Sequence, residues 1–239
     1  MELSRKEQEI SHQAVEYVKA HKRHLIERVV NLEKSAPPED PLAIFMAGSP
    51  GAGKTEFSQR LLPLLEHESQ RNIIAIDPDQ IRTWMPGYGG GNAHLFQKAV
   101  TRVVNEVFSS VIKSQQDFLL DGTLAKFDIG RQNIERALRR GYSVMIVYVY
   151  QDPVSAWKFT QAREIDEGRR IRKETFINQY FSARVTVNDL KKYFQDDITV
   201  ALVVKDFLHN IKQFESDIDS IDEYLKVQYT PDTIEKILK

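Results

Sequence analysis

The sequence predicts an α/β protein in which helices cover both faces of a mainly parallel, five-stranded sheet. Five short apolar runs alternate along the chain with longer segments of helical pattern. Because the runs are almost continuous in Val, Ile and Leu, they fit strands that are buried on both faces, and the alternation with helices favours parallel pairing. Helical patterns precede and follow this part. We therefore predict an N-terminal helical extension with a linker (residues 1–40), a three-layer core (41–205) and a C-terminal helical extension (206–239).

The N-terminal extension reads as helix over residues 4–34. Ser4 and Glu7 have the spacing of a capping box, and apolar residues recur from Ile10 at near-helical intervals. The segment SAPPEDP (residues 35–41) follows, and its prolines predict the end of the helical pattern and a stiff connection.

The five predicted strands span residues 42–47, 73–76, 118–120, 144–150 and 198–204. Longer helical patterns separate them, as expected for parallel strands joined by helical crossovers. From about residue 206 the pattern is again helical, and Thr230 before Pro231 predicts the cap and first turn of a short terminal helix.

The composition limits the classes of protein to which the chain can belong. Its 239 residues are 41% hydrophobic and 28% charged, which is ordinary for a globular protein with a substantial core. A formal net charge of -1 gives no general attraction to nucleic acid, so we do not expect a nucleic-acid partner. The absence of cysteine excludes disulfides and thiolate metal sites and agrees with a reducing compartment.

No membrane segment is expected either. The first residues lack the apolar stretch of a secretory signal. The longest apolar run, residues 142–150, is too short to cross a bilayer as a helix. A cytoplasmic protein without a membrane partner is the expectation.

A glycine-rich motif follows the first predicted strand. GSPGAGKT has the spacing G-x-x-x-x-G-K-[ST] and stands between a strand and a helical pattern. In such a P-loop, backbone N–H groups and a helix N-terminus bind phosphate oxygens, the lysine reaches the terminal phosphates, and the hydroxyl can ligate Mg²⁺. A P-loop NTPase fold that binds ATP or GTP with Mg²⁺ is therefore predicted. The expected nucleotide-binding residues are Gly48, Ser49, Pro50, Gly51, Ala52, Gly53, Lys54 and Thr55, with Thr55 also the metal ligand.

The P-loop alone leaves the reaction open. A GTPase would need a guanine-reading N-K-x-D segment, and the sequence has none. A motor ATPase usually carries longer machinery and offers an arginine to a neighbouring subunit. At this length a phosphotransferase is favoured.

The stretch IDPDQIR leaves the second predicted strand and carries two acids, Asp77 and Asp79. They should lie at the carboxyl edge of the sheet, where open α/β folds bind ligands and where the P-loop also lies. Phosphoryl transfer to a hydroxyl needs a carboxylate that orients and deprotonates it, and Asp79 is our candidate base. Arg82 can bind a phosphate of the acceptor. The alternative is an Asx-type turn at the end of the strand, with Asp77 capping the next helix.

Two further segments are candidates for acceptor binding. In WMPGYGGGNAH, Trp84 and Tyr88 can stack on a ring and Asn92 can cap the following helix, although a plain surface loop fits the composition equally well. In FLLDGTLAKFD, Asp121 ends a strand and can join the Mg²⁺ shell or bind an acceptor hydroxyl, with Thr123 donating nearby. An ordinary Asp-Gly turn is the alternative.

The segment QAREIDEGRRIRKETF (residues 161–176) gathers basic residues after the fourth predicted strand. At helical spacing such a run can be a solvated face with ion pairs to neighbouring acids. The functional interpretation is a lid whose arginines stabilise charge on the transferred phosphoryl group, with Gly168 as its hinge. We favour Arg163 and Arg169 for this role.

Together these motifs resemble the zeta toxin family. GSPGAGKT, IDPDQIR with MPGY, LLDGTLAKFD, RALRRGY and AREIDEGRR occur in the family's order, and the resemblance covers residues 42–205. It implies transfer of the γ-phosphate of ATP or GTP to a sugar hydroxyl of UDP-N-acetylglucosamine, which poisons bacterial cell-wall precursor synthesis. It also implies the site residues: Asp79 as base, Lys54 in the P-loop, Asp121 and Thr123 for the acceptor, and Arg163 and Arg169 in the lid, with Arg170 or Arg172 as alternates.

Two departures from the family pattern touch the acceptor side. The family often carries Glu at the position of Asp121, and its sugar-site arginine is here Ala125, for which the neighbouring Lys126 is a candidate substitute. The N-terminal helices lie outside the family core. They are scaffolding or a built-in inhibitor resembling the family's separate helical antitoxins.

Other functions remain open at this point. The same motifs suit a kinase of a polynucleotide end or of an antibiotic, because Asp79 and Arg82 form a D-x-x-R pair that such enzymes also use. A nucleotide-binding regulator without turnover is a further alternative, against which intact Lys54, Thr55 and Asp79 argue.

Overall fold

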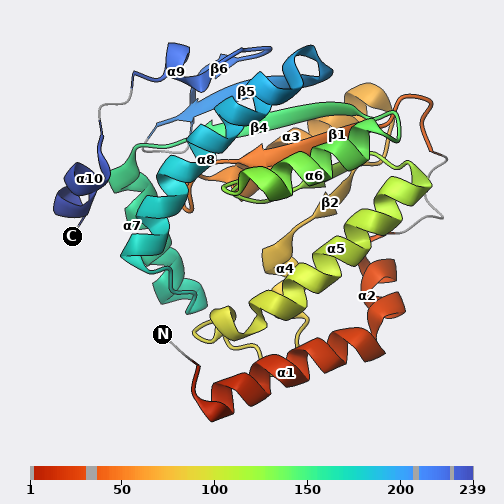
Figure 1. Ribbon diagram of the computed structural model, residues 1–239, viewed down its shortest axis with the longest axis vertical. Coiled ribbons are helices and arrows are strands. Elements are labelled where there is room, and N and C mark those ends of the chain that lie inside the picture. Colours follow the sequence, from red (N-terminus) through yellow and green to blue (C-terminus); the bar gives the residue numbers. More distant parts are fainter. Residues whose placement is uncertain (1–2, 31–36, 207–209, 227–228, 239) are drawn as a thin grey trace.

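The computed structural model describes residues 3–30, 37–206, 210–226 and 229–238. In this part of the chain, six strands form one sheet with the order β2-β3-β1-β4-β5-β6. Strands β1 to β5 are parallel, and β6 runs antiparallel to β5 at one edge. The predicted α/β fold with a mainly parallel sheet is confirmed (Figure 1). The strands are β1 (Leu42–Ala47), β2 (Ile74–Ile76), β3 (Phe118–Leu120), β4 (Ser143–Tyr150), β5 (Ile198–Lys205) and β6 (Ile211–Glu215).

The sixth strand is a correction to the sequence prediction, which had five strands and a helical pattern after residue 206. Asn210 returns the chain beside β5: its backbone N–H donates to the Asp206 carboxylate at 2.9 Å, and its carbonyl accepts from the Asp206 N–H at 2.9 Å. The short β6 then pairs with residues 202–205 of β5. Because β6 is largely exposed, it lacks the continuous apolar run by which the other strands were found.

Helices cover both faces of the sheet, so the fold has three layers. On one face α3 packs through Phe57 and partly buried leucines against alternate residues of β1 and β4. On the other face α5, α6 and α8 enclose the main core. The helices are α1 (Arg5–Ala20), α2 (Lys22–Val29), α3 (Lys54–Ser69), α4 (Pro78–Thr83), α5 (Gln97–Ser114), α6 (Phe127–Leu138), α7 (Pro153–Glu167), α8 (Lys173–Phe194), α9 (Ile221–Tyr224) and α10 (Pro231–Ile237), with short 3₁₀ turns η1 (Ala93–Phe96) and η2 (Gln195–Asp197).

The N-terminal segment forms two helices, α1 and α2, that meet at His21 and pack along α5 (Figure 1). Ser4 caps α1 in a complete capping box with Glu7, as the sequence predicts. Val18 and Leu25 are buried and belong to the main core. The last predicted helical residues, 31–34, and the first two residues of the predicted linker, 35–36, lie outside the described residues.

At the C-terminal end, Thr230 caps α10 and Pro231 occupies its first turn, as predicted. The buried Ile234 and Leu238 pack with Trp157 and Phe176 of α7 and α8. Among the described residues, no helix is both long and apolar enough to cross a membrane.

Candidate active site

The P-loop lies between β1 and α3, with Lys54 at the first position of the helix. The Lys54 ammonium donates to the backbone carbonyls of Gly48 at 3.1 Å and Ser49 at 2.7 Å. Burial lowers the pKa of Lys54 to about 8, and the nearby Asp121 carboxylate partly opposes this shift. The lysine is therefore poised over the loop in the position from which it can meet phosphate oxygens.

Asp121 follows β3, the strand that pairs directly with β1, so it lies beside the start of α3. The hydroxyl of Thr55 donates to the Asp121 carboxylate at 2.7 Å. Burial raises the pKa of Asp121, and the positive charge of Lys54 opposes the shift. The backbone of Thr123 accepts from the Gly48 N–H at 3.2 Å, which joins the acid loop to the P-loop.

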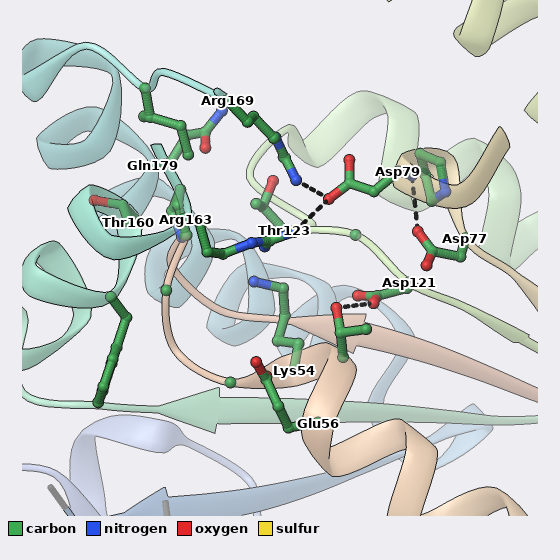
Figure 2. Close-up of a pocket in the computed structure, with 18 of the residues that line it drawn as sticks. Lys54, Glu56, Asp77, Asp79, Asp121, Thr123, Thr160, Arg163, Arg169 and Gln179 are labelled. Atoms are coloured by element: carbon green, nitrogen blue, oxygen red, sulfur yellow. Dashed lines mark hydrogen bonds and ion pairs between the residues drawn. The ribbon is translucent and has the colours of Figure 1, made fainter. Parts of the chain in front are cut away.

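Asp77 and Asp79 have different roles in the structure. Asp77 is the N-cap of α4, and its carboxylate accepts from the backbone N–H of Asp79 at 2.7 Å. This is the capping alternative that the sequence left open for Asp77. Asp79 lies in the first turn of α4. Its side chain is 31% exposed, and the carboxylate is turned into the cavity (Figure 2).

Three arginines surround the Asp79 carboxylate. Arg169 forms a hydrogen-bonded ion pair with Oδ2, and the Arg163 guanidinium lies 3.5 Å from the same oxygen (Figure 2). Arg82, one turn along α4, donates to Oδ1 at 2.5 Å. The basic segment 161–176 and Asp79 therefore meet, although Arg163 and Arg169 lie 84 and 90 positions after Asp79 in the sequence.

Arg82 lines the cavity beside Asp79, and its predicted role as an acceptor-phosphate ligand stays a prediction. Its side chain is only 6% exposed, and besides Asp79 it donates to the Gln97 side-chain oxygen at 3.2 Å. Gln97 in turn donates to Thr101 at 3.3 Å, so α5 holds the arginine in place. These contacts hold the Arg82 guanidinium between Asp79 and Gln97.

All of these groups line one cavity of about 350 Å³. Its walls come from the P-loop, the ends of β2 and β3, and the helices α7 and α8 (Figure 2). Eleven of the lining residues are site residues that the sequence predicted: Pro50, Gly51, Gly53, Lys54, Thr55, Asp79, Arg82, Asp121, Thr123, Arg163 and Arg169. Asp77, which the sequence placed at the same edge, also lines the cavity. The sequence prediction missed several others. Gln97, Phe159, Thr160 and Gln179 reach the cavity only through tertiary packing, whereas Glu56 directly follows the P-loop and Asp166 and Ile171 lie in the basic segment 161–176.

Some predicted site residues do not line this cavity. Gly48, Ser49 and Ala52 complete the P-loop but do not line the cavity, and Ser49 and Ala52 are buried. Tyr88 packs edge-on against Phe96, with ring centroids 5.7 Å apart, and does not line the cavity either.

The remaining candidates of the loops also have other surroundings. Trp84 stacks under the guanidinium of Arg28 of α2, at 4.3 Å from the ring centroid. Lys126 is exposed at the N-cap position of α6, outside the cavity lining. Of the alternate lid arginines, Arg170 is exposed and lies 3.6 Å from Glu164, and Arg172 is the N-cap residue of α8.

The sheet order, the P-loop and the acids at its edge place the chain among known proteins. A model of the zeta toxin family matches residues 26–217. The chain belongs to the zeta toxin family. Toxin PezT of Streptococcus pneumoniae serotype 4 (strain ATCC BAA-334 / TIGR4) is 24% identical over 132 residues, which is 52% of this chain and 51% of PezT. The match thus spans about half the length of this curated relative.

Solved structures agree with a zeta toxin fold. A chain from the PezAT chromosomal toxin-antitoxin system of Streptococcus pneumoniae superimposes with a TM-score of 0.56 at 16% identity, covering 100% of this chain and 88% of that one. A chain of the AvrRxo1-ORF1:-ORF2 complex with ATP gives a TM-score of 0.59 at 10% identity, with 92% and 69% covered. At these low sequence identities, the superpositions show a shared fold and nothing further.

The N-terminal helices of this zeta toxin family member do not reach the cavity. Its lining contains no residue from the described part of α1 and α2. The two helices pack instead mainly against α5, η1 and β2, and Arg28 of α2 also lies over Trp84. The scaffolding interpretation of the extension therefore fits the described residues better than a built-in inhibitor of the nucleotide site.

Proposed function

We propose that the protein is a kinase that transfers the γ-phosphate of ATP or GTP to a hydroxyl of a nucleotide sugar, with UDP-N-acetylglucosamine as the first candidate. One observation carries this proposal: the Asp79 carboxylate shares a cavity with the P-loop lysine and lies in contact with Arg163 and Arg169. A base, a phosphate-binding cation and two further cations around one cavity are the groups that in-line phosphoryl transfer to an alcohol needs.

Each group has a defined part in this proposal. The triphosphate binds on the P-loop, with its terminal phosphates toward Lys54. Asp79 accepts the proton of the acceptor hydroxyl while that oxygen bonds to the γ-phosphorus and the bond to the nucleoside diphosphate breaks. Arg163 and Arg169 stabilise the negative charge on the transferred phosphoryl group.

Thr55 and Asp121 are the residues that fit a Mg²⁺ ion. Their side-chain oxygens lie 2.7 Å apart beside the phosphate loop, and Mg²⁺ is commonly held by one or two protein oxygens together with water and substrate phosphates. A Mg²⁺ ion held by Thr55 and Asp121 would supply positive charge next to the bound triphosphate. Asp121 is thereby proposed as a metal ligand in addition to its implied contact with the acceptor.

The proposed identity of the acceptor, a nucleotide sugar, rests mainly on the membership of the chain in the zeta toxin family. The polar side chains of the cavity that are not committed to the P-loop include Gln97, Thr123 and Gln179, which suit the hydroxyl and amide groups of a sugar. Lys126 does not line the cavity, so we no longer propose it as a substitute for the family's sugar-site arginine. A cytoplasmic location, where such a substrate would be met, and a separate helical antitoxin partner belong to the same proposal.

The test is a phosphotransfer assay with γ-labelled ATP or GTP and separate pools of UDP-sugars, 5′-hydroxyl oligonucleotides and chloramphenicol. We expect label on a UDP-sugar, seen by mass spectrometry as a product heavier by one phosphate. Asp79→Asn should lower the rate by about 10²–10⁴ while nucleotide binding persists, whereas Asp189→Asn on the exposed face of α8 should not change it. Label on another acceptor would refute the nucleotide sugar, and an unchanged Asp79→Asn rate would refute the base.

A further inference from the structure

The glycine-rich loop after α4 (residues 87–92, here called the glycine loop) lies against the C-terminal end of α7. A Cβ placed on Gly90 would collide with the carbonyl oxygen of Glu167 and lie 3.0 Å from its carbonyl carbon and 3.2 Å from the Gly168 Cα. From the other side, a Cβ on Gly168 would lie 3.2 Å from the Gly91 nitrogen. Every atom in these contacts belongs to backbone, so no side-chain rotation can make room. Two glycines facing each other allow the loop and the helix end to touch.

This contact joins the two sides of the cavity. Gly168 ends α7 with φ 70°, and it is flanked by the lid residues Arg163, inside the helix, and Arg169, directly after it. The glycine loop connects α4, which carries Arg82, to α5, which begins with Gln97. Arg82 donates a hydrogen bond to the Gln97 side chain, and both residues line the cavity.

The loop has a fixed shape of its own, which lets it act as a support. The side chain of Asn92 accepts from the Gly89 N–H at 2.9 Å and donates to the Gly87 carbonyl at 2.8 Å, closing the loop on itself. Tyr88 anchors it on Phe96 in the core. Gly90 is therefore presented to α7 from a braced turn.

The opposite end of α7 is supported in the same way. A Cβ on Gly51 of the P-loop would collide with the carbonyl oxygen of Ala156 and lie 3.0 Å from the Thr160 methyl group. The helix that bears Arg163 thus contacts the nucleotide-binding loop in its N-terminal half and the glycine loop at its C-terminal end.

We propose that Gly90 and Gly168 are positioning residues that set the height of the lid arginines over the cavity and couple the lid to the wall formed by Arg82 and Gln97. Because this backbone contact restrains the end of α7, a shift of the glycine loop also moves the C-terminal end of α7 and, with it, Arg169. Misplacement of reacting groups by about 1 Å can cost roughly 10²-fold in rate. The kinetic consequence rests on the proposed kinase function, but the contact itself does not.

The chain offers matched control variants within the same loop. Gly90→Ala adds both an unfavourable positive φ, 72°, and the collision with Glu167. Gly87→Ala adds only the positive φ, 80°, because no other atom lies within 4 Å of the new Cβ. Gly89→Ala adds neither. Comparing the three separates backbone strain from loss of the contact.

We expect Gly90→Ala to lower kcat by about 10- to 100-fold with KM for ATP within about twofold, and to speed hydrogen exchange of backbone amides in residues 164–170. Gly87→Ala and Gly89→Ala should match the wild type in both readings. The idea fails if Gly90→Ala exchanges like Gly87→Ala in that segment, or if all three variants lose kcat equally.

Hydrogen exchange also separates this inference from the proposed function. If no acceptor is phosphorylated, the kinase proposal falls, while the exchange of residues 164–170 in the variants still decides the contact. Should Gly90→Ala not fold, the wild type provides the test: on addition of a non-hydrolysable ATP analogue, residues 87–92 and 164–170 should gain protection together. Protection of only one segment would overturn the coupling.

Discussion

At the residue scale, the contacts of Asp79 account for an acid just after the buried strand β2, at the carboxyl edge of the sheet. The carboxylate is held by Arg82 from its own helix and by Arg163 and Arg169 from the lid. All three arginines line the cavity, but Arg82 is the most buried of them and is also held by a hydrogen bond to Gln97. One carboxylate thus connects the sheet edge to the lid.

Lys54 predicts a pH dependence of nucleotide binding. Because burial lowers its pKa to about 8, the lysine is charged below that pH and loses its charge as the pH rises through it. Bound phosphates favour the charged form, so the affinity should follow the pKa of the free protein. At pH 9 the Kd for a fluorescent ATP analogue should be about tenfold higher than at pH 7.

The control for this prediction is Lys54→Met, measured by the same titration across the same pH range. This variant should bind weakly and with little change in Kd from pH 7 to pH 9. A wild-type Kd that stays flat up to pH 9.5 would show that the lysine keeps its proton well above pH 8.

At the element scale, α4 depends on Asp77 as its cap. Asp77→Ala should cost about 1 kcal/mol of unfolding free energy and also lower phosphotransfer, because the lost hydrogen bond goes to the backbone of Asp79. Asp77→Asn should preserve most of both, since Asn caps helices as well as Asp does. Denaturant unfolding and the phosphotransfer assay check this pair. Equal loss in both variants would instead assign a role to the Asp77 charge.

The sequence predicts those elements whose signal is local. The strands β1 to β5 are apolar runs, the P-loop has fixed spacing, and Ser4 and Thr230 cap their helices as expected. The sequence favoured Asp79 as the base but left open whether Asp77 caps the next helix, because the start of α4 decides which acid caps it. Gln97 and Gln179 had no local signal, since helices packed far along the chain bring them to the cavity.

Trp84, at the end of α4, and Tyr88, in the glycine loop, likewise have neighbours that the local sequence could not predict. Composition favoured Tyr88 and Trp84 equally as ring-stacking groups and as surface residues. Their actual neighbours, Phe96 and Arg28, come from η1 and from the N-terminal helices. An aromatic residue in a loop indicates that it will pack against something, but the partner is set by the tertiary fold.

At the scale of the whole molecule, the N-terminal helices are continuous with the core. Ala14, Val18, Leu25 and Val30 are at most 4% exposed and belong to the same cluster as β1 and α5. Arg28 also covers Trp84, which follows α4, so this extension supports the wall of the cavity that carries Asp79 and Arg82. Removing the extension would expose the apolar face of α5 to water.

This continuity predicts that deletion of residues 1–38 destabilises the protein and does not release activity. Leu25→Ala should reproduce the effect in the full chain, with a loss of about 2–5 kcal/mol of unfolding free energy, whereas Lys6→Ala on the exposed face of α1 should be neutral. Thermal unfolding and growth inhibition on expression are the measurements. We expect no released activity because no described residue of α1 or α2 lines the cavity. A truncated protein that is stable and inhibits growth more strongly would mean that the extension restrains the site, and the scaffolding role would be wrong.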